Sequence, residues 1–340
     1  MLDKKCSRER IVIPVLVVFL LIISLLSLRF GSAKMSTREF FFALLDKSSD
    51  PASVILYSVR IPRLLAGLLA GCGLALSGVL LQTVTDNYLA SPNVVGVNAG
   101  AGFGVVIALA LLPASIGVLS YLLLPMIAFA SALATTFIVL IISRAAGGSR
   151  SSIVLAGVAI TALLNAFISA ANLADSDILS SYNAFSVGGF NGVTYTDMIL
   201  PAGIVAACFI ISLILSGKTE LLALGPTVAS SLGVRVSLVR TVSIICAAAS
   251  AAAVVSFAGL LGFVGLIVPH IARFLVGSRP SRMLPASMLV GASVCVLADY
   301  IGRIVISPSE LPVGITMAFV GAPFFVFLLF RKRGESQNGY

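Results

Sequence analysis

The chain has 340 residues, of which 59% are hydrophobic and only 10% charged, and its mean hydropathy is +1.12. A soluble domain is typically about 45–50% apolar and about 25% charged, so this composition excludes water-soluble domains and predicts a polytopic membrane protein. The net charge of +9 would suggest a nucleic-acid partner in a soluble protein. Here the basic residues lie mainly between apolar runs, so we expect contact with membrane lipid and no nucleic-acid partner.

Apolar runs follow one another along the whole chain. A helix needs about 20 apolar residues to cross a membrane, and eight runs meet this length. Two shorter runs contain glycine and are tolerated inside a bundle. We therefore predict an all-α integral membrane protein with about ten transmembrane helices in a single bundle, as one domain over 1–340; eight full spans and two re-entrant segments are the alternative. The predicted spans are 11–28, 64–84, 99–112, 121–142, 153–173, 198–215, 241–260, 263–276, 284–306 and 313–330.

An even number of spans places both termini on one side of the membrane. In this arrangement 15 of the 22 Lys and Arg residues lie on the side of the termini, and 7 lie on the other. Cytoplasmic loops carry the excess of Lys and Arg, so both termini are expected to be cytoplasmic. The first apolar run is longer than the core of a signal peptide and no A-x-A site follows it, so we expect it to be retained.

Two longer segments are expected on the outer face. Ser36 and Glu39 have the spacing of a capping box ahead of an apolar stretch, which predicts a short amphipathic helix lying on that face. The segment 174–197 is rich in Ser, Asn, Asp and Gly and is expected to be a loop, with room for a short helix.

Arginines stand at the outer ends of two spans. Arg60 and Arg63 open the second span against the positive-inside trend, so they either reach lipid headgroups or bind a carboxylate partner. Asp299 and Arg303 have i, i+4 spacing near the end of the ninth span. Because charge inside a membrane is costly, they either form an ion pair or expose a cation to water, and both interpretations stay open.

Motifs for chemistry are weak throughout. Gly217–Thr219 resembles the end of a phosphate-binding loop, but the required preceding glycine is Ser212 and an apolar helix precedes it, so we expect no nucleotide hydrolysis here. His270 is the single histidine and has no metal-ligating neighbour in sequence, which indicates a packed histidine at a helix kink. We expect no catalytic residue, no metal site and no cofactor bound by this chain.

The inner segment 216–240 has mixed polarity. Apolar residues recur in it at helical spacing, with interruptions at Gly225 and Gly233. A solvated loop is one interpretation, but an apolar stripe on a cytoplasmic loop favours a docking surface for a partner.

Six stretches of the sequence resemble the FecCD-type permease family of type II ABC importers, which includes permeases for ferric siderophores, haem and cobalamin. The resemblance runs from about residue 11 to residue 330, and GFVGLIVPHIAR with ELPVGI is its most specific part. The stretches are RIPR at 60–63, QTVTDNYLASPNVVGVNAGAG at 82–102, LAGVA at 155–159, LALGPTVASSLG at 222–233, GFVGLIVPHIAR at 262–273 and ELPVGITMAFVGAP at 310–323.

The resemblance implies a dimeric permease in the bacterial cytoplasmic (inner) membrane, with ten membrane helices in each subunit. It also implies a second permease subunit, as a homodimer or heterodimer, two cytoplasmic ATPase subunits that hold ATP and Mg, and an extracytoplasmic substrate-binding protein.

The resemblance implies roles for individual residues as well. Binding-protein docking maps to Arg60, Arg63 and Arg303. ATPase coupling maps to the region 222–236, with Leu222, Leu224, Gly225, Ala229, Leu232 and Gly233. A cytoplasmic gate maps to Asn87, Leu89, Ser149 and Ser151, where Arg150 stands at a position expected to hold a small or hydroxylated residue.

The expected function is the transmembrane permease subunit of an ATP-driven importer for a metal chelate, with a ferric siderophore as first choice and haem or cobalamin as alternatives. An ion-coupled secondary transporter is the main rival, but it would require buried acids near mid-membrane, and Asp299 lies near one end of its span. A membrane enzyme would require a catalytic constellation that the sequence does not contain.

Overall fold

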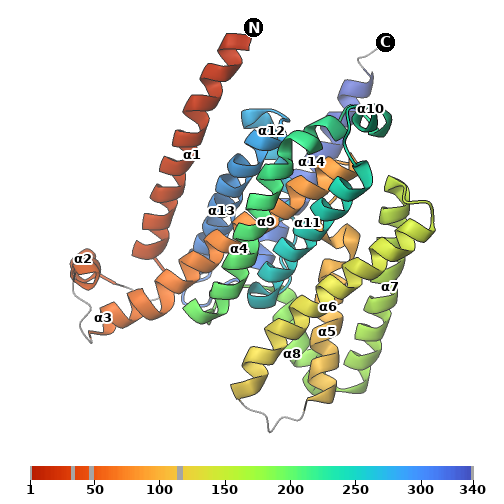
Figure 1. Ribbon diagram of the computed structural model, residues 1–340. Helices are drawn as coiled ribbons and strands as arrows, with labels where there is room; N and C mark the ends of the chain where they lie inside the picture. Colours follow the sequence, from red (N-terminus) through yellow and green to blue (C-terminus); the bar gives the residue numbers. More distant parts are fainter. Residues whose placement is uncertain (1, 32–34, 46–49, 113–117, 338–340) are drawn as a thin grey trace.

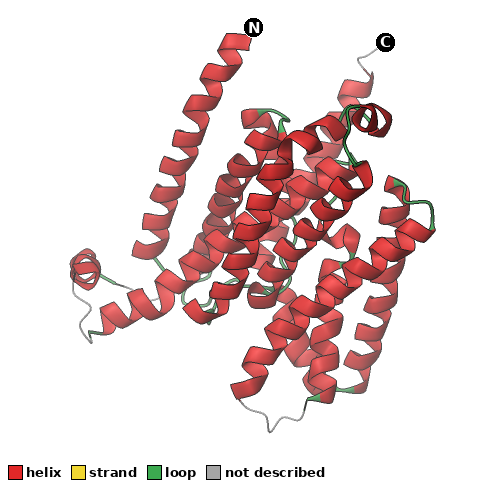
Figure 2. Cartoon of the chain, viewed as in Figure 1, coloured by secondary structure: helices red, strands yellow, loops and turns green. Residues whose placement is uncertain are grey.

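The computed structural model describes residues 2–31, 35–45, 50–112 and 118–337. This described part consists of helices and loops and contains no strand (Figure 2). A π-helical turn, Ile55–Arg60, joins α3 to α4, and a 3₁₀ turn, Pro92–Val95, precedes α5. The α-helices are α1 (Leu2–Arg29), α2 (Thr37–Leu45), α3 (Pro51–Val54), α4 (Ile61–Thr85), α5 (Val97–Leu111), α6 (Val118–Ala145), α7 (Arg150–Ala174), α8 (Ser176–Val187), α9 (Tyr195–Leu222), α10 (Pro226–Ser231), α11 (Val236–Ala258), α12 (Val264–Val276), α13 (Pro280–Val305) and α14 (Val313–Gln337).

Helices occupy all ten predicted span positions, and the all-α membrane fold is confirmed. Within the part of the chain that the structure describes in full, seven helices are long and apolar enough to cross a membrane, and shorter apolar helical stretches lie at Val97–Leu111, Val264–Val276 and Val313–Val326, the last being the first part of α14. The start of α1 and the end of α14 lie at one end of the molecule together with α10, as an even number of crossings requires (Figure 1). Helices α2, α3 and α8 lie toward the opposite end.

Several helices continue beyond their apolar runs. The second predicted span is the last part of a continuous helix from Pro51 to Thr85. Helix α9 runs to Leu222 and α11 begins at Val236, so the connection between them is shorter than the predicted segment 216–240. Hydropathy marks the part of a helix that lies in hydrocarbon, whereas polar residues such as Lys218 continue the same helix outside it.

Small residues let the central helices approach closely. Helix α4 packs against α11, α12 and α13. A Cβ added at Gly71 would overlap the backbone of Gly291 on α13, and one added at Gly78 would overlap the backbone of Gly265 on α12. Without a side chain these backbones come into direct contact, which is how helices associate where lipid removes the hydrophobic driving force.

The segments outside the bundle follow the sequence signals. Ser36 and Glu39 form the predicted capping box, with the Ser36 N–H 2.7 Å from Glu39 Oε2 and the Glu39 N–H 3.2 Å from Ser36 Oγ. The hydrogen bond from the Ser36 backbone is the main cause that lowers the pKa of Glu39 below its ordinary value. Phe40 is buried whereas Phe41 and Phe42 are exposed, so α2 is amphipathic as expected. The segment 174–197 contains α8, which the Asp175 side chain caps.

Candidate functional site

Three arginines gather at the end of the molecule opposite the termini. Arg60 ends the π-helical turn, Arg63 lies in the first turn of α4, and Arg303 lies in the last turn of α13. The continuous helix fixes the first two, since residues three apart lie on neighbouring parts of one helix face. All three are buried, with exposed fractions of 5%, 6% and 4%. With Asp299 and Glu310 they form what we call the arginine cluster.

Two carboxylates pair with two of these arginines. Arg63 Nε lies 2.8 Å from Asp299 Oδ1, and Arg63 Nη1 lies 2.6 Å from Glu310 Oε2. Arg303 Nε lies 3.0 Å from Asp299 Oδ2. Of the two interpretations of Asp299 and Arg303, the i, i+4 ion pair is therefore the one that forms. Asp299 thus neutralises one arginine on α4 and one on α13. A charged side chain near the membrane interior is costly unless it is paired in this way.

The remaining donors of the cluster bind the end of α1. Arg60 Nη1 donates to the carbonyl oxygens of Leu28 and Arg29 at 2.6 and 2.9 Å. Arg303 Nη2 donates to the Ser27 carbonyl oxygen at 3.1 Å. The last four carbonyls of a helix have no partner inside the helix, so the two arginines supply the donors that α1 lacks.

The sequence prediction that Arg303 lies at the level of Arg60 and Arg63 is confirmed. The cluster does not have the geometry of headgroup anchors, because the guanidinium groups point into the protein and contact Asp299, Glu310 and α1. Their role in docking a binding protein stays a prediction. Neither sequence position nor local spacing links Glu310 to Arg63, which is 247 residues away.

At the opposite end, the apolar residues in and beside α10 fall into a buried group and an exposed group. Ala229 is fully buried and packs with Leu222, Val234 and Val239, which hold α10 against the ends of α9 and α11. Leu224, Val228 and Leu232 are instead 60%, 47% and 58% exposed. Val228 lies in α10, Leu224 precedes it and Leu232 caps its end, and we call these three exposed residues the α10 surface.

The six predicted coupling residues therefore have three structural roles. Leu222 and Ala229 are buried, whereas Leu224 and Leu232 belong to the α10 surface. Gly225 and Gly233 flank the helix with φ angles of +98° and +81°. Residues other than glycine rarely adopt such angles, so these two positions set the turns that begin and end α10.

The predicted gate residues lie in two segments that an ion pair connects. Arg150 Nη1 lies 2.8 Å from Asp86 Oδ2, which joins the start of α7 to the end of α4. Ser149 caps α7 by accepting a hydrogen bond from the Ser152 N–H at 3.0 Å. Arg150, unexpected at this position, thus holds the two segments together. Whether they form a gate stays a prediction.

The loop after α4 is also held by α12. The Asn87 side chain accepts a hydrogen bond from the Leu89 N–H at 3.0 Å. Between them, the Tyr88 ring lies 4.2 Å from the guanidinium carbon of Arg273 and contacts His270 edge-on at 6.1 Å. A cation over an aromatic face is attractive, so the motif that includes His270 and Arg273 positions this loop. The sequence analysis missed this contact because it joins distant segments.

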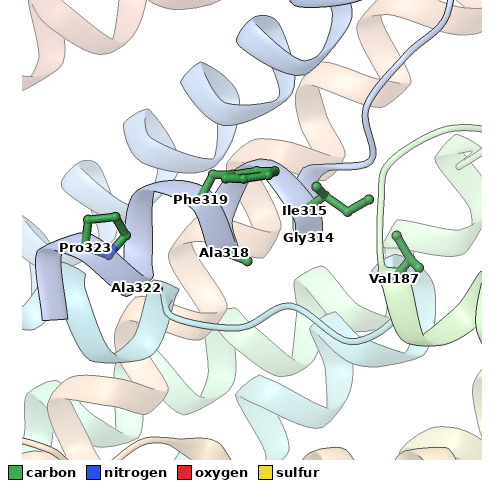
Figure 3. Close-up of a pocket in the computed structure, with 7 residues that line it drawn as sticks. All are labelled: Val187, Gly314, Ile315, Ala318, Phe319, Ala322 and Pro323. Carbon is green, nitrogen blue, oxygen red and sulfur yellow. The ribbon is translucent and has the colours of Figure 1, made fainter. Parts of the chain in front are cut away.

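An apolar hollow of about 540 Å³ lies beside α14 (Figure 3). The side chains that line it come from the end of α8 and from the first half of α14. They are Val187, Gly314, Ile315, Ala318, Phe319, Ala322 and Pro323. Among the described residues, no three His, Cys, Asp or Glu side chains come together as metal ligands.

Comparisons with known proteins place these features in a transport family. The profile of the FecCD transport family matches residues 19–331. The chain is 34% identical over 328 residues to the Fe(3+)-citrate import permease protein YfmE of Bacillus subtilis, covering 96% of each chain. It is 35% identical over 327 residues to the ferric enterobactin permease protein FepD of Escherichia coli, covering 95% of this chain and 96% of FepD. It is 32% identical over 330 residues to the hemin permease protein HmuU of Yersinia pestis, covering 96% and 98%.

Solved structures agree with this similarity. A transporter assigned to the metal-chelate type of ABC transporters, in an inward-facing conformation, superposes with a TM-score of 0.79 at 29% identity, covering 95% of this chain and 99% of that one. PsaBC from Streptococcus pneumoniae shares the fold, with a TM-score of 0.58 at 18% identity, covering 79% and 90%.

Proposed function

Because the chain belongs to the FecCD transport family, we propose that it is the transmembrane permease subunit of an ATP-binding-cassette importer for a metal chelate, most simply a ferric siderophore. The observation that supports this is the match to the family profile over residues 19–331. The relatives named for ferric citrate and ferric enterobactin match nearly the whole chain. Haem or cobalamin are the alternative cargoes.

The chain works in this proposal as one part of a larger assembly. A second permease subunit completes the pathway, and two ATPase subunits that hold ATP and Mg dock at the α10 surface. An extracytoplasmic binding protein docks at the end that contains the arginine cluster. The chain itself does no covalent chemistry. Its contribution is to open the pathway to one side of the membrane or the other when partners dock at its two ends. This requires that each partner bind one conformation of the permease more tightly than the other.

Uptake driven by ATP distinguishes this function from an ion-coupled transporter. We expect proteoliposomes containing the permease and its cognate ATPase subunits to take up a radio-iron siderophore delivered by the cognate binding protein. Uptake should require ATP on the ATPase side and should persist when ionophores collapse all ion gradients. Uptake that is independent of ATP and stops with ionophores would establish the secondary transporter instead. The location of Asp299 in an ion pair with two arginines supports the first outcome.

The topology that we propose places both termini in the cytoplasm of a bacterium, with the chain in its inner membrane. Single cysteines at Ser36 and Gln337, introduced without native thiols, should separate the two sides. An impermeant maleimide added to intact spheroplasts is expected to label Ser36→Cys and to label Gln337→Cys only after lysis. The reverse pattern would invert the topology, and with it the sides assigned to the arginine cluster and the α10 surface.

A further inference from the structure

Glu310 lies in a different structural setting from Asp299, although both contact Arg63. Asp299 lies within α13 and its side chain is 3% exposed, whereas Glu310 lies in the connection between α13 and α14 and its side chain is 24% exposed. Moving Asp299 away from Arg63 would require α13 to move. Glu310 is attached to backbone outside the helices, so its carboxylate is the one that can be displaced.

A cavity reaches this second ion pair. Its volume is about 680 Å³, and both Arg63 and Glu310 belong to its lining. Polar groups of Asn183 and Asn191, from α8 and the loop after it, line the same cavity. A carboxylate arriving from outside the chain thus has a path to the guanidinium of Arg63, and Glu310 occupies the position where it would bind.

The other cations of the cluster are less available. Arg60 and Arg303 donate to the carbonyl oxygens of Ser27, Leu28 and Arg29 at the end of α1. Arg303 also pairs with Asp299, which is almost fully buried. The Arg63–Glu310 pair is the part of the cluster that both reaches the cavity and includes a partly exposed carboxylate.

We propose that Glu310 is an internal substitute for an acidic side chain of the binding protein, and that docking exchanges one carboxylate for the other at Arg63. The partner is therefore a protein that presents a Glu or Asp at this end of the permease. This inference rests on the proposed function. It adds that in the undocked permease Glu310 masks Arg63, which means that it occupies the guanidinium donors that the binding protein would use. Guanidinium groups bind carboxylates in a forked geometry, so the two acids compete for the same donors.

Release of Glu310 would also reach α14. The Leu311 N–H, next in the chain, donates to the Gly302 carbonyl oxygen at 2.9 Å, and the Gly314 N–H donates to the Gly188 carbonyl oxygen at 3.3 Å. A Cβ added at Gly314 would overlap the backbone of Val187 at the end of α8. Glu310 is thus tied by short links to the junction of α8 and α14, so the exchange transmits docking to the helix that lines the apolar hollow.

Removing the mask is expected to strengthen docking. With the complete importer in nanodiscs and its cognate binding protein as the probe, the Glu310→Gln permease should bind that protein several-fold more tightly than the wild-type permease. Glu39→Gln is the matched control, because it removes an acid from the same end of the molecule and Gln still completes a capping box. A gain confined to Glu310→Gln supports the exchange. Equal gains in both variants indicate general electrostatics, and no gain or a loss at Glu310→Gln equally overturns the proposal.

A second measurement follows Arg63 directly, first without the binding protein and then with it. Phenylglyoxal modifies accessible arginines, and peptide mass spectrometry should show faster modification of Arg63 in Glu310→Gln than in wild type or Glu39→Gln. Bound binding protein should suppress this reaction. If wild type binds the protein but Arg63 reactivity does not change in any state, the mask is wrong while docking stands. If the wild-type permease does not bind the binding protein at all, the proposed docking at this end is wrong. The exchange at Arg63 is then wrong as well.

Discussion

Replacing Asp299 with asparagine is expected to destabilise the protein by about 3–5 kcal/mol, because it breaks two buried ion pairs and leaves the buried Arg303 without its carboxylate partner, whereas Arg63 keeps Glu310. Arg63 and Arg303 both lose a carboxylate partner at 2.8 and 3.0 Å, while their side chains are only 7% and 4% exposed. The readout is the temperature at which the detergent-solubilised permease loses its monodisperse size-exclusion peak.

The Asp86→Asn variant supplies the matched control for this experiment. Asp86 also pairs with an arginine at 2.8 Å, but its side chain is 60% exposed and that of Arg150 is 35% exposed. Exposed pairs contribute about 0–1 kcal/mol because water already solvates both charges. A large downward shift for Asp299→Asn and a small one for Asp86→Asn are expected. Equal shifts would mean that burial of the arginine cluster does not determine its contribution to stability.

The same burial limits charge reversal as a test of docking. From the sequence alone, Arg60→Glu with Arg63→Glu is expected to weaken docking while leaving assembly with the ATPases intact. In the structure, Arg63→Glu would place a third carboxylate beside Asp299 and Glu310. Loss of binding in that variant would then follow from damaged packing as readily as from a lost contact. The Glu310→Gln variant avoids this ambiguity, because it is expected to increase the affinity for the binding protein and damaged packing would not do so.

The sequence could predict features that depend on local pattern. A helix lies at each of the ten predicted apolar runs, and seven helices of the described part are long and apolar enough to cross a membrane, a length that is set by the thickness of the hydrocarbon layer. The capping box at Ser36 and the ion pair of Asp299 with Arg303 also depend on residues three or four positions apart. Such spacings have a fixed meaning in a helix, so no knowledge of tertiary structure was required.

Features that depend on contacts between distant segments could not be predicted. The Arg63–Glu310 pair joins α4 to the connection between α13 and α14, and the Tyr88–Arg273 contact joins α12 to the loop after α4. Predicting them requires the packing of the helices, which single-sequence hydropathy does not contain. The burial of the arginines could not be predicted for the same reason: the end of α1 contacts Arg60 and Arg303, and nothing in the sequence of α1 indicates which helix ends it meets.

Replacing Leu232 with aspartate is expected to abolish co-purification of the ATPase subunits and ATP-driven uptake while leaving the permease folded. Leu232 is 58% exposed and lies on the α10 surface with Leu224 and Val228. An apolar patch on a protein surface that borders water favours a partner, and a charge placed in it must lose hydration when that partner docks. Leu232→Met is the matched control, because it keeps the apolar character and nearly the volume of leucine.

The neighbouring positions show why Leu232 is the informative one. Ala229→Asp would insert a charge into the fully buried contact that holds α10 in place, and Gly233→Asp would force a residue with a side chain into a φ of +81°. Both would disturb α10 itself, so loss of the ATPases would have two explanations. Leu232→Asp changes only what α10 presents to a partner. If the Leu232→Asp variant retains the ATPases and transports as well as Leu232→Met does, then the α10 surface is exposed to solvent and the ATPase subunits dock at another part of the permease.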